Sequence, residues 1–111
     1  VSALHEQTGA LVMADCGSAA DAKAAADAGA DLIGTTLAGY TGERPKTDGP
    51  DLELIAGIAV LDLGRPLIAE GRIHTPAQAR ACVDAGAFAV VVGTAITHPA
   101  TITGWFADAL A

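Results

Sequence analysis

An internal repeat limits the folds open to this chain of 111 residues. The segment LVMADCGSAADAKAAADAGADLIGTT, residues 11–36, aligns with LIAEGRIHTPAQARACVDAGAFAVVVGTA, residues 67–95. Each copy holds an apolar run that ends in alanine and an acid, an alanine-rich stretch that ends in Ala-Gly-Ala, and a second apolar run. The middle glycines of the two Ala-Gly-Ala sequences, Gly29 and Gly86, lie 57 residues apart. Each copy therefore predicts a strand, a helix and a second strand.

The helical parts of the repeat carry start and stop signals. Serine and threonine are preferred N-caps, proline suits the first helical position, and glycine commonly ends a helix. The residues in these places are Ser18 and Gly29 in the first copy and Thr75, Pro76 and Gly86 in the second. Two further helices are expected, one over residues 51–63 after Pro50 and one that begins near Pro99 or Ala100 and runs through Trp105.

The apolar runs LVMA, LIA and FAVVV are continuous rather than alternating, which is typical of strands buried on both faces in a parallel sheet. The chain therefore contains four strand-helix units of roughly 28 residues each, whereas a closed (β/α)8 barrel takes about 250 residues. We predict an α/β fold in which residues 1–111 form a single (β/α)4 half-barrel, the C-terminal half of a TIM barrel. An open four-stranded sheet is the alternative, but it would leave apolar edge strands unprotected.

Charge and cysteine content argue against several classes of partner. The formal charge of −7 and the isoelectric point near 4.5 disfavour nucleic acid and an anionic membrane surface. No apolar run is long enough to predict a membrane span, and no signal peptide is visible. Cys16 and Cys82 form neither a disulfide framework nor a metal-ligand cluster, so we expect buried free thiols and a cytoplasmic location. Because the first residue is Val1, we expect the sequence to be part of a longer protein.

Polar residues gather where the predicted strands end, and in barrels the working face lies at the carboxyl ends of the strands. The residues that follow the four strands are Asp15; Thr35, Thr36, Gly39, Tyr40 and Thr41; Glu70, Gly71 and Arg72; and Gly93 and Thr94. The two acids of the repeat therefore fall on one rim of the sheet. Helix capping, a turn at Asp15, or a salt bridge between Glu70 and Arg72 would be purely structural interpretations.

Gly71 and the Gly93-Thr94 pair follow what would be the last two strands of a barrel. Many barrels hold a phosphate there, using loop amides and the N-terminus of a short extra helix. Arg72 directly after Gly71 strengthens the phosphate interpretation, although a tight turn explains either glycine alone. Residues 38–50, AGYTGERPKTDGP, form the one long polar loop, and long loops after strands are often functional.

The three histidines are less informative. We expect His5 to be exposed, His74 to have a rim or capping role, and His98 to lie where it could approach a phosphate. No pair of His, Cys, Asp or Glu residues has metal-ligand spacing, and there is no Ser-His-Asp signature or dinucleotide fingerprint. The residues alone therefore predict no metal site.

Five stretches in this order, VMADC, DLIGTTLAGYT, DLELI, LIAEGRIHTPAQA and AVVVGTAIT, closely resemble the C-terminal half of the bacterial N-acetylmannosamine-6-phosphate 2-epimerases. The resemblance covers Leu11 to Trp105, and GTTLAGYT and AEGRIHTP are its most specific motifs. It implies an isomerase of sialic-acid and amino-sugar catabolism that uses no cofactor and no metal. Such an enzyme interconverts N-acetylmannosamine 6-phosphate and N-acetylglucosamine 6-phosphate by inverting C2.

The resemblance also implies roles for individual residues. Glu70 matches a catalytic carboxylate that works beside the main acid/base, a lysine on a strand of the N-terminal half. The substrate-binding matches are Asp15 for the sugar hydroxyls, Thr36, Tyr40 and Thr41 for the sugar pocket, and Gly71, Arg72, Gly93 and Thr94 for the phosphate end. Neither Lys23 nor Lys46 matches the family's lysine. The family usually has arginine where this chain has His98, and histidine is the weaker phosphate ligand.

Two alternatives stay open at this point. The chain could be a non-catalytic or truncated half-barrel that only binds sugar phosphates. It could also belong to another phosphate-binding TIM-barrel enzyme, such as a thiamine-phosphate-synthase-like protein, although the GYT and AEGRIHTP motifs weigh against this. In each case the small-molecule partner is a phosphate ester. Open barrel edges predict either a homo-oligomer or pairing with an N-terminal half-barrel.

Overall fold

The computed structural model describes all of residues 1–111. Four parallel strands form one sheet in the order β1-β2-β3-β4. The strands are β1 (Met13–Asp15), β2 (Leu32–Gly34), β3 (Leu67–Glu70) and β4 (Ala89–Val91). The helices are α1 (Ser2–Thr8), α2 (Ala19–Asp27), α3 (Leu52–Ala59), α4 (Pro76–Asp84), α5 (Thr94–Thr97) and α6 (Pro99–Leu110). The parallel sheet and the four strand-helix units are therefore confirmed.

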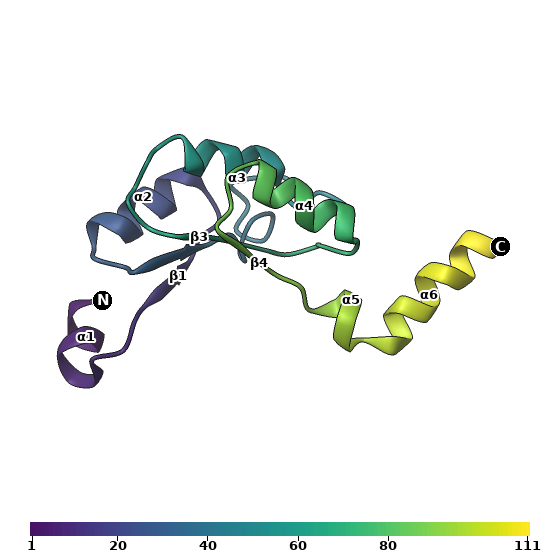
Figure 1. The fold of residues 1–111 in the computed structure, drawn as a ribbon, viewed down its shortest axis with the longest axis horizontal. Helices are drawn as coiled ribbons and strands as arrows, with labels where there is room; N and C mark the ends of the chain where they lie inside the picture. The colour runs from purple at the N-terminus through teal and green to yellow at the C-terminus, as the bar shows by residue number, and fades with distance from the viewer.

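Helices α2, α3 and α4 cover one face of the sheet and leave the other face open (Figure 1). Neighbouring residues in the strand register point to the same face, so the pairs Ala14–Ile33, Ile33–Leu67 and Ala69–Val90 all face the helices. These residues belong to the core or pack against it. The uncovered face carries Met13 and Val91, whose exposed fractions are 44% and 39%. A sheet with helices on one face alone is what half of a barrel requires.

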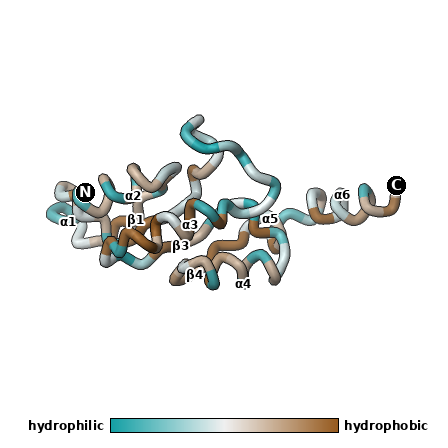
Figure 2. The backbone as a smooth tube through the Cα atoms, turned by 90° about the horizontal axis from the view of Figure 1, so that it is seen from above, coloured by the Kyte–Doolittle hydropathy of each residue, from teal (hydrophilic) through white to brown (hydrophobic).

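The core lies between the sheet and the three helices. Its largest members include Ile33 in β2 and Leu54, Ile55 and Ile58 in α3. The strands stand out as the most hydrophobic part of the backbone in Figure 2. Cys16 and Cys82 are both free and buried in this core, as predicted. Burial raises the pKa of each thiol, because the thiolate would lose its hydration.

The predicted N-cap residues and helix-ending glycines have these roles in the structure. The Ser18 hydroxyl accepts from the Asp21 amide at 3.1 Å, and Thr75 forms a capping box with Gln78. Pro76 is the first residue of α4, and Gly29 and Gly86 follow α2 and α4 with positive φ angles of 96° and 121°. These local signals therefore fix where α2 and α4 begin and end.

Three boundaries differ from the prediction. The helix expected over residues 51–63 is shorter, because Asp51 is its N-cap and Asp62 and Gly64 take positive φ angles of 49° and 68°. The first strand begins at Met13 rather than Leu11, because the Val12 amide and carbonyl already bind the loop before β2. Helices α1 and α5 were not predicted, since each is short and α1 buries no residue.

His5 was predicted to be exposed, and this was wrong. Its Nε2 atom lies 2.7 Å from Asp31 Oδ2, and the imidazole is only 36% exposed. The same Asp31 carboxylate accepts from the Val12 amide at 2.8 Å, so it ties α1 to the start of the sheet. These two contacts, the Val12 amide first, lower the pKa of Asp31.

Helix α6 begins at Pro99, as predicted, but does not fold back onto the sheet. It runs away from the other helices in two perpendicular views (Figures 1 and 2). It packs against α5, and the ring centroid of its Trp105 lies 4.4 Å from that of His74. Phe106 and Leu110 are exposed at 70% and 88%. Helix α6 therefore presents apolar side chains that nothing in this chain covers.

Candidate functional site

Two carboxylates stand at the carboxyl ends of strands on the uncovered face. Asp15 ends β1 and is in register with Gly34, while Glu70 ends β3 and is in register with Val91. The Thr36 hydroxyl lies between them, 3.0 Å from Asp15 Oδ1 and 2.6 Å from Glu70 Oε2. Because β2 separates β1 from β3, one hydroxyl just past β2 can bridge both acids. The structure thus brings together three of the predicted site residues.

Thr35 fixes the backbone on which Glu70 stands. This threonine is buried, and its hydroxyl accepts from the Glu70 amide at 3.1 Å and donates to the Glu70 carbonyl at 3.3 Å. The side chain of the residue that follows β2 thereby bonds both the backbone amide and the backbone carbonyl of the residue that ends β3. The sequence reasoning placed Thr35 at the strand end but gave it no role. Nothing in a Gly-Thr-Thr sequence shows which threonine turns toward the neighbouring strand.

A cavity of about 590 Å³ opens beside these acids at the carboxyl ends of the strands. Six predicted site residues and four others line it: Thr36, Tyr40, Glu70, Gly71, Arg72 and Thr94, with Lys46, Thr47, Asp48 and His74. Tyr40 is the one hydrophobic residue among them, so the walls suit a polar ligand. The four additional residues come from the long loop and the turn after β3, and the sequence analysis had assigned none of them to the site.

A smaller cavity of about 130 Å³ adjoins the first and shares Glu70, Gly71, Arg72, His74 and Thr94 with it. It also reaches Gly93, so the three residues predicted for the phosphate end lie around one hollow. Gly93 precedes the short helix α5, which begins at Thr94. The turns after β3 and β4 therefore meet here, as parallel neighbouring strands require.

Arg72 reaches this cavity from a strained backbone. Its φ angle is 56°, a region that residues with a side chain rarely adopt, and the preceding Gly71 has a φ of 107°. The guanidinium donates from Nε to the Gly49 carbonyl at 3.1 Å, whereas Nη1 is buried without a partner. No salt bridge links Arg72 to Glu70, so that structural interpretation of the two residues is not supported. A buried donor without a partner is costly, which favours an anionic ligand at this place.

Two cations lie near the ring of Tyr40. The Lys46 Nζ atom is 5.0 Å from the centroid of its ring, and the Arg72 Cζ atom is 5.4 Å from the same centroid. Both distances are within the range of cation–π attraction. The Arg72 guanidinium first, and Lys46 after it, lower the pKa of the Tyr40 hydroxyl. Two of the six Lys and Arg residues therefore lie near this ring, in a chain whose formal charge is −7.

The long loop is anchored at several points. Arg44 donates from Nε and Nη2 to Asp51, at 2.6 and 3.0 Å, and Asp51 also accepts from the Leu54 amide at the start of α3. The guanidinium holds the pKa of the buried Asp51 carboxyl below its usual range. At the other end, a Cβ on Gly39 would lie 2.8 Å from the Lys46 Cα, so these two parts of the loop pack directly on each other. The loop thus has a defined shape over the cavity.

Asp15, Thr41 and His98 do not line either of these two cavities, whereas His74 lines both. Asp15 is exposed and reaches the cavity only through Thr36, while Thr41 packs its side chain against Gly17, between β1 and α2. The His74 amide donates to Gln78 Oε1 at 2.7 Å, which confirms its place in the helix cap. His98 bonds Thr101 at the start of α6 and lines none of the cavities. The expectation that His98 approaches the phosphate end is therefore not met in this structure.

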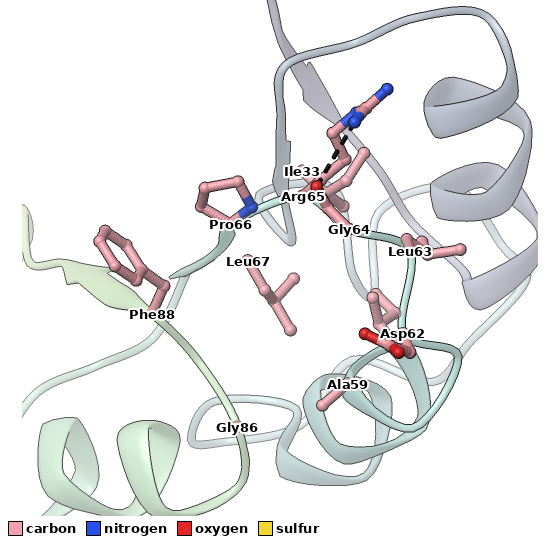
Figure 3. Close-up of a pocket in the computed structure, with 11 residues that line it drawn as sticks. Ile33, Ala59, Asp62, Leu63, Gly64, Arg65, Pro66, Leu67, Gly86 and Phe88 are labelled. Atoms are coloured by element: carbon pink, nitrogen blue, oxygen red, sulfur yellow. Dashed lines mark hydrogen bonds between the residues drawn. The ribbon is translucent and has the colours of Figure 1, made fainter.

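Another cavity, of about 370 Å³, lies at the opposite ends of the strands (Figure 3). Leu63, Pro66, Leu67 and Phe88 contribute much of its apolar wall, and the Arg65 side chain turns to the Ala30 carbonyl. In barrels the end of the sheet opposite the carboxyl ends of the strands serves stability rather than chemistry. No group of three or more His, Cys, Asp or Glu side chains is arranged to hold a metal ion. No helix is long and apolar enough to cross a membrane.

Comparison with known proteins identifies relatives of this chain. It is 68% identical over 111 residues to the "Putative N-acetylmannosamine-6-phosphate 2-epimerase" of Cutibacterium acnes, and the match covers 99% of this chain and 48% of that protein. It is 53% identical over 105 residues to the "Bifunctional enzyme NanE/NanK" of Brucella melitensis, covering 95% of this chain and 20% of that protein. The chain thus spans about half the length of the epimerase that it matches.

Two solved structures, one of an epimerase and one of an oxidase, superpose on this chain. The N-acetylmannosamine-6-phosphate 2-epimerase of Clostridium perfringens superposes with a TM-score of 0.90 at 40% identity, covering 97% of this chain and 46% of that protein. A mandelate oxidase superposes less closely, with a TM-score of 0.67 at 26% identity and 28% of that protein covered. The predicted half-barrel is therefore confirmed. The family model of NanE, "Putative N-acetylmannosamine-6-phosphate epimerase", matches residues 1–111 in full, and the chain belongs to this family.

Proposed function

We propose that this chain supplies the catalytic carboxylate and the phosphate end of a sugar-phosphate epimerase. The reaction interconverts N-acetylmannosamine 6-phosphate and N-acetylglucosamine 6-phosphate by removing and returning the proton at C2. The observation that carries the proposal is the Asp15–Thr36–Glu70 contact, which places two acids beside a polar cavity that also holds an unpaired Arg72. A carboxylate next to a cationic hollow suits a substrate with an acidic C–H at one end and a phosphate at the other.

The chemistry requires a base, an acid and a site for a developing negative charge. The C2 proton is acidic only while C1 is an aldehyde, so the sugar must be bound in its open-chain form. One group removes the proton, and another returns a proton to the opposite face of C2. The enolate oxygen formed in between requires a hydrogen-bond donor. We assign Glu70 to one of the proton transfers, because its carboxylate lines the cavity.

Asp15 and Thr36 would hold the sugar hydroxyls. A threonine hydroxyl has a single proton, so Thr36 can donate to only one of the two carboxylates at a time. The other carboxylate keeps its lone pairs for a substrate hydroxyl. Tyr40 and Thr41 would shape the rest of the sugar pocket, Tyr40 from within the larger cavity and Thr41 through its packing on Gly17.

Gly71, Arg72, Gly93 and Thr94 would bind the phosphate. All four line the smaller cavity, and Arg72 brings the buried Nη1 donor that has no partner within the chain. Phosphate oxygens are strong acceptors for guanidinium groups, so a bound phosphate would satisfy this donor. Loop amides of two glycine-containing turns are suited to the same task, because no side chain keeps the ligand away from the backbone.

We infer that the second proton-transfer group comes from another polypeptide segment. Lys46 is the one lysine in the cavity wall, and it comes from the long loop rather than from a strand. We propose that the uncovered face, which includes Met13 and Val91, is covered by an N-terminal half-barrel that carries the main acid/base lysine. The exposed apolar residues of α6, Phe106 and Leu110, support further pairing between copies. The two buried free thiols suit a reducing compartment, and we propose the cytoplasm.

The proposal is tested with a fused barrel, in which residues 1–111 are joined to the remaining half of the Cutibacterium acnes relative. In deuterium oxide, this protein should incorporate deuterium at C2 of N-acetylglucosamine 6-phosphate and form the C2 epimer. Glu70→Gln should slow both processes by about 10²- to 10⁴-fold, the usual contribution of a general acid or base. Glu6→Gln, on the exposed face of α1, is the matched control and should have no effect. Binding without deuterium incorporation in the unmodified barrel would refute the proposed reaction.

A further inference from the structure

Cations are scarce in this chain, and nearly all of them are engaged. There are six Lys and Arg residues against 13 Asp and Glu residues. The ion pairs are Lys23 with Asp27, Arg44 with Asp51 and Glu53, and Arg80 with Asp84. Arg65 lies at the opposite end of the sheet and donates to two backbone carbonyls. The remaining two, Lys46 and Arg72, form no ion pair, and both line the larger cavity.

Lys46 and Arg72 line the same cavity as Asp48 and Glu70, but neither cation forms a salt bridge with a carboxylate. Both sit within 5.4 Å of the centre of the Tyr40 ring. A ring quadrupole attracts cations, but it has no net charge to compensate two of them. The pKa of the Tyr40 hydroxyl is lowered first by a hydrogen bond with Arg72 and then by the charges of Lys46 and Arg72. An anion bound in this cavity would give both cations a counter-charge.

Contacts on both sides of Lys46 along the chain fix the backbone of the loop that carries it. Gly39 packs against its backbone, with room for no Cβ, and has a φ of 86° that glycine adopts most readily. On the other side of Lys46 along the chain, the Gly49 carbonyl accepts from Arg72 Nε. The loop is thus tied to the same arginine with which Lys46 shares the cavity. The backbone of Lys46 and the guanidinium of Arg72 are therefore both held by contacts within the chain.

We propose that Lys46 is a specificity-determining residue, which together with Arg72 makes the site select a doubly charged phosphate ester over a singly charged ester of the same sugar. This inference rests on the proposed function, because that function supplies the sugar phosphate as the substrate class. A phosphate monoester carries a charge of about −1.5 to −2 at neutral pH. One arginine can balance one of these charges, and Lys46 provides the second.

The test measures binding, so that it does not depend on turnover. The fused barrel is titrated by calorimetry with N-acetylglucosaminitol 6-phosphate and with the corresponding 6-sulfate, which is a monoanion. Neither alditol has a C1 carbonyl, so neither can epimerise. The unmodified protein should bind the phosphate more tightly than the sulfate. Lys46→Met should reduce this preference by about tenfold, the usual magnitude for a hydrogen bond to a charged group, while Lys46→Arg should retain it.

The matched control is Lys23→Met, which changes the net charge by the same amount on the exposed surface of α2. It should leave the preference unchanged. Lys46→Gln is a second neutral variant, and circular dichroism checks that each protein is folded. An unchanged phosphate-to-sulfate ratio in both neutral variants, or an equal loss in Lys23→Met, would overturn the role of Lys46. An unmodified protein without any preference would overturn it too.

Failure of the Lys46 proposal can be distinguished from failure of the epimerase proposal. If the barrel exchanges deuterium at C2 while the neutral Lys46 variants keep the full preference, the epimerase proposal stands and the Lys46 proposal falls. If the neutral variants lose the preference but the barrel never exchanges the C2 proton, the charge-selective site stands and the epimerase proposal falls.

Discussion

The hydroxyl that joins the two acids offers a direct test of how the site is organised. Thr36→Val keeps the size and branching of the side chain but removes the donor that lies 2.6 Å from Glu70 and 3.0 Å from Asp15. A hydrogen bond to a charged group contributes about 1.5–3 kcal/mol. Because Thr36 is half-buried and has one proton to donate, we take the lower end of that range, about 1.5–2 kcal/mol. This corresponds to a loss of about 10- to 30-fold in kcat/KM.

The assay is C2 deuterium incorporation in the fused barrel, measured with Thr36→Val and with Thr36→Ser. Serine restores the hydroxyl and should recover most of the activity, whereas valine should not. Since Thr36 is not part of the buried core, the urea unfolding midpoint should change little in either variant. Full activity in Thr36→Val, or an equal loss in Thr36→Ser, would show that the bridging hydroxyl does not organise the acids.

Two further predictions concern the scaffold, and both use urea unfolding of the fused barrel. Gly86→Ala should cost about 2–4 kcal/mol, because its Cβ would lie 2.5 Å from that of Ala59 at a φ of 121°, while Gly64→Ala, with open space around it, should cost only about 1 kcal/mol. Equal costs would contradict the packing argument. Arg44 is the main cause of the lowered pKa of Asp51 in the folded state. The ionised Asp51 therefore stabilises the fold fully above the unfolded pKa of about 3.9. This contribution to the free energy of unfolding is lost as the pH falls through the lowered folded-state pKa. The stability difference between the unmodified protein and Asp51→Asn should therefore shrink in that acidic window, and a difference that stays constant would contradict this linkage.

Local signals made most of the fold predictable. The caps at Ser18 and Thr75 and the glycines that end α2 and α4 act within a few residues, and the structure has them as expected. The failures occur where a longer-range contact decides. His5 is half-buried because Asp31, far along the chain, needs a partner beside the first strand. Helix α3 ends early because of the backbone of Asp62, which the apolar sequence pattern does not reveal.

The sequence predicted which residues lie at the carboxyl ends of the strands, but not which of their side chains contact one another. Strand order alone places Asp15 and Glu70 on the same edge, because parallel strands share the direction of their carboxyl ends. The Thr36 hydroxyl can contact both acids only because β2 lies between β1 and β3. Lys46 escaped notice because a lysine in a polar loop is ordinarily a solvated charge. Its significance lies in its lack of a carboxylate partner, which only the set of all ion pairs shows.

Under the proposed function, the substrate must exchange a proton at C2 and be held by its phosphate, and different residues of the cavity would serve these two requirements. The acids lie at the ends of strands, where Thr35 holds the backbone of Glu70 with two hydrogen bonds. The unpaired cations lie on the turn after β3 and on the long loop, with the Tyr40 ring near both. Arg72 forms no salt bridge with Glu70, so its guanidinium stays available for an anion. Under the proposed function, Glu70 would exchange the C2 proton while the unpaired cations hold the phosphate.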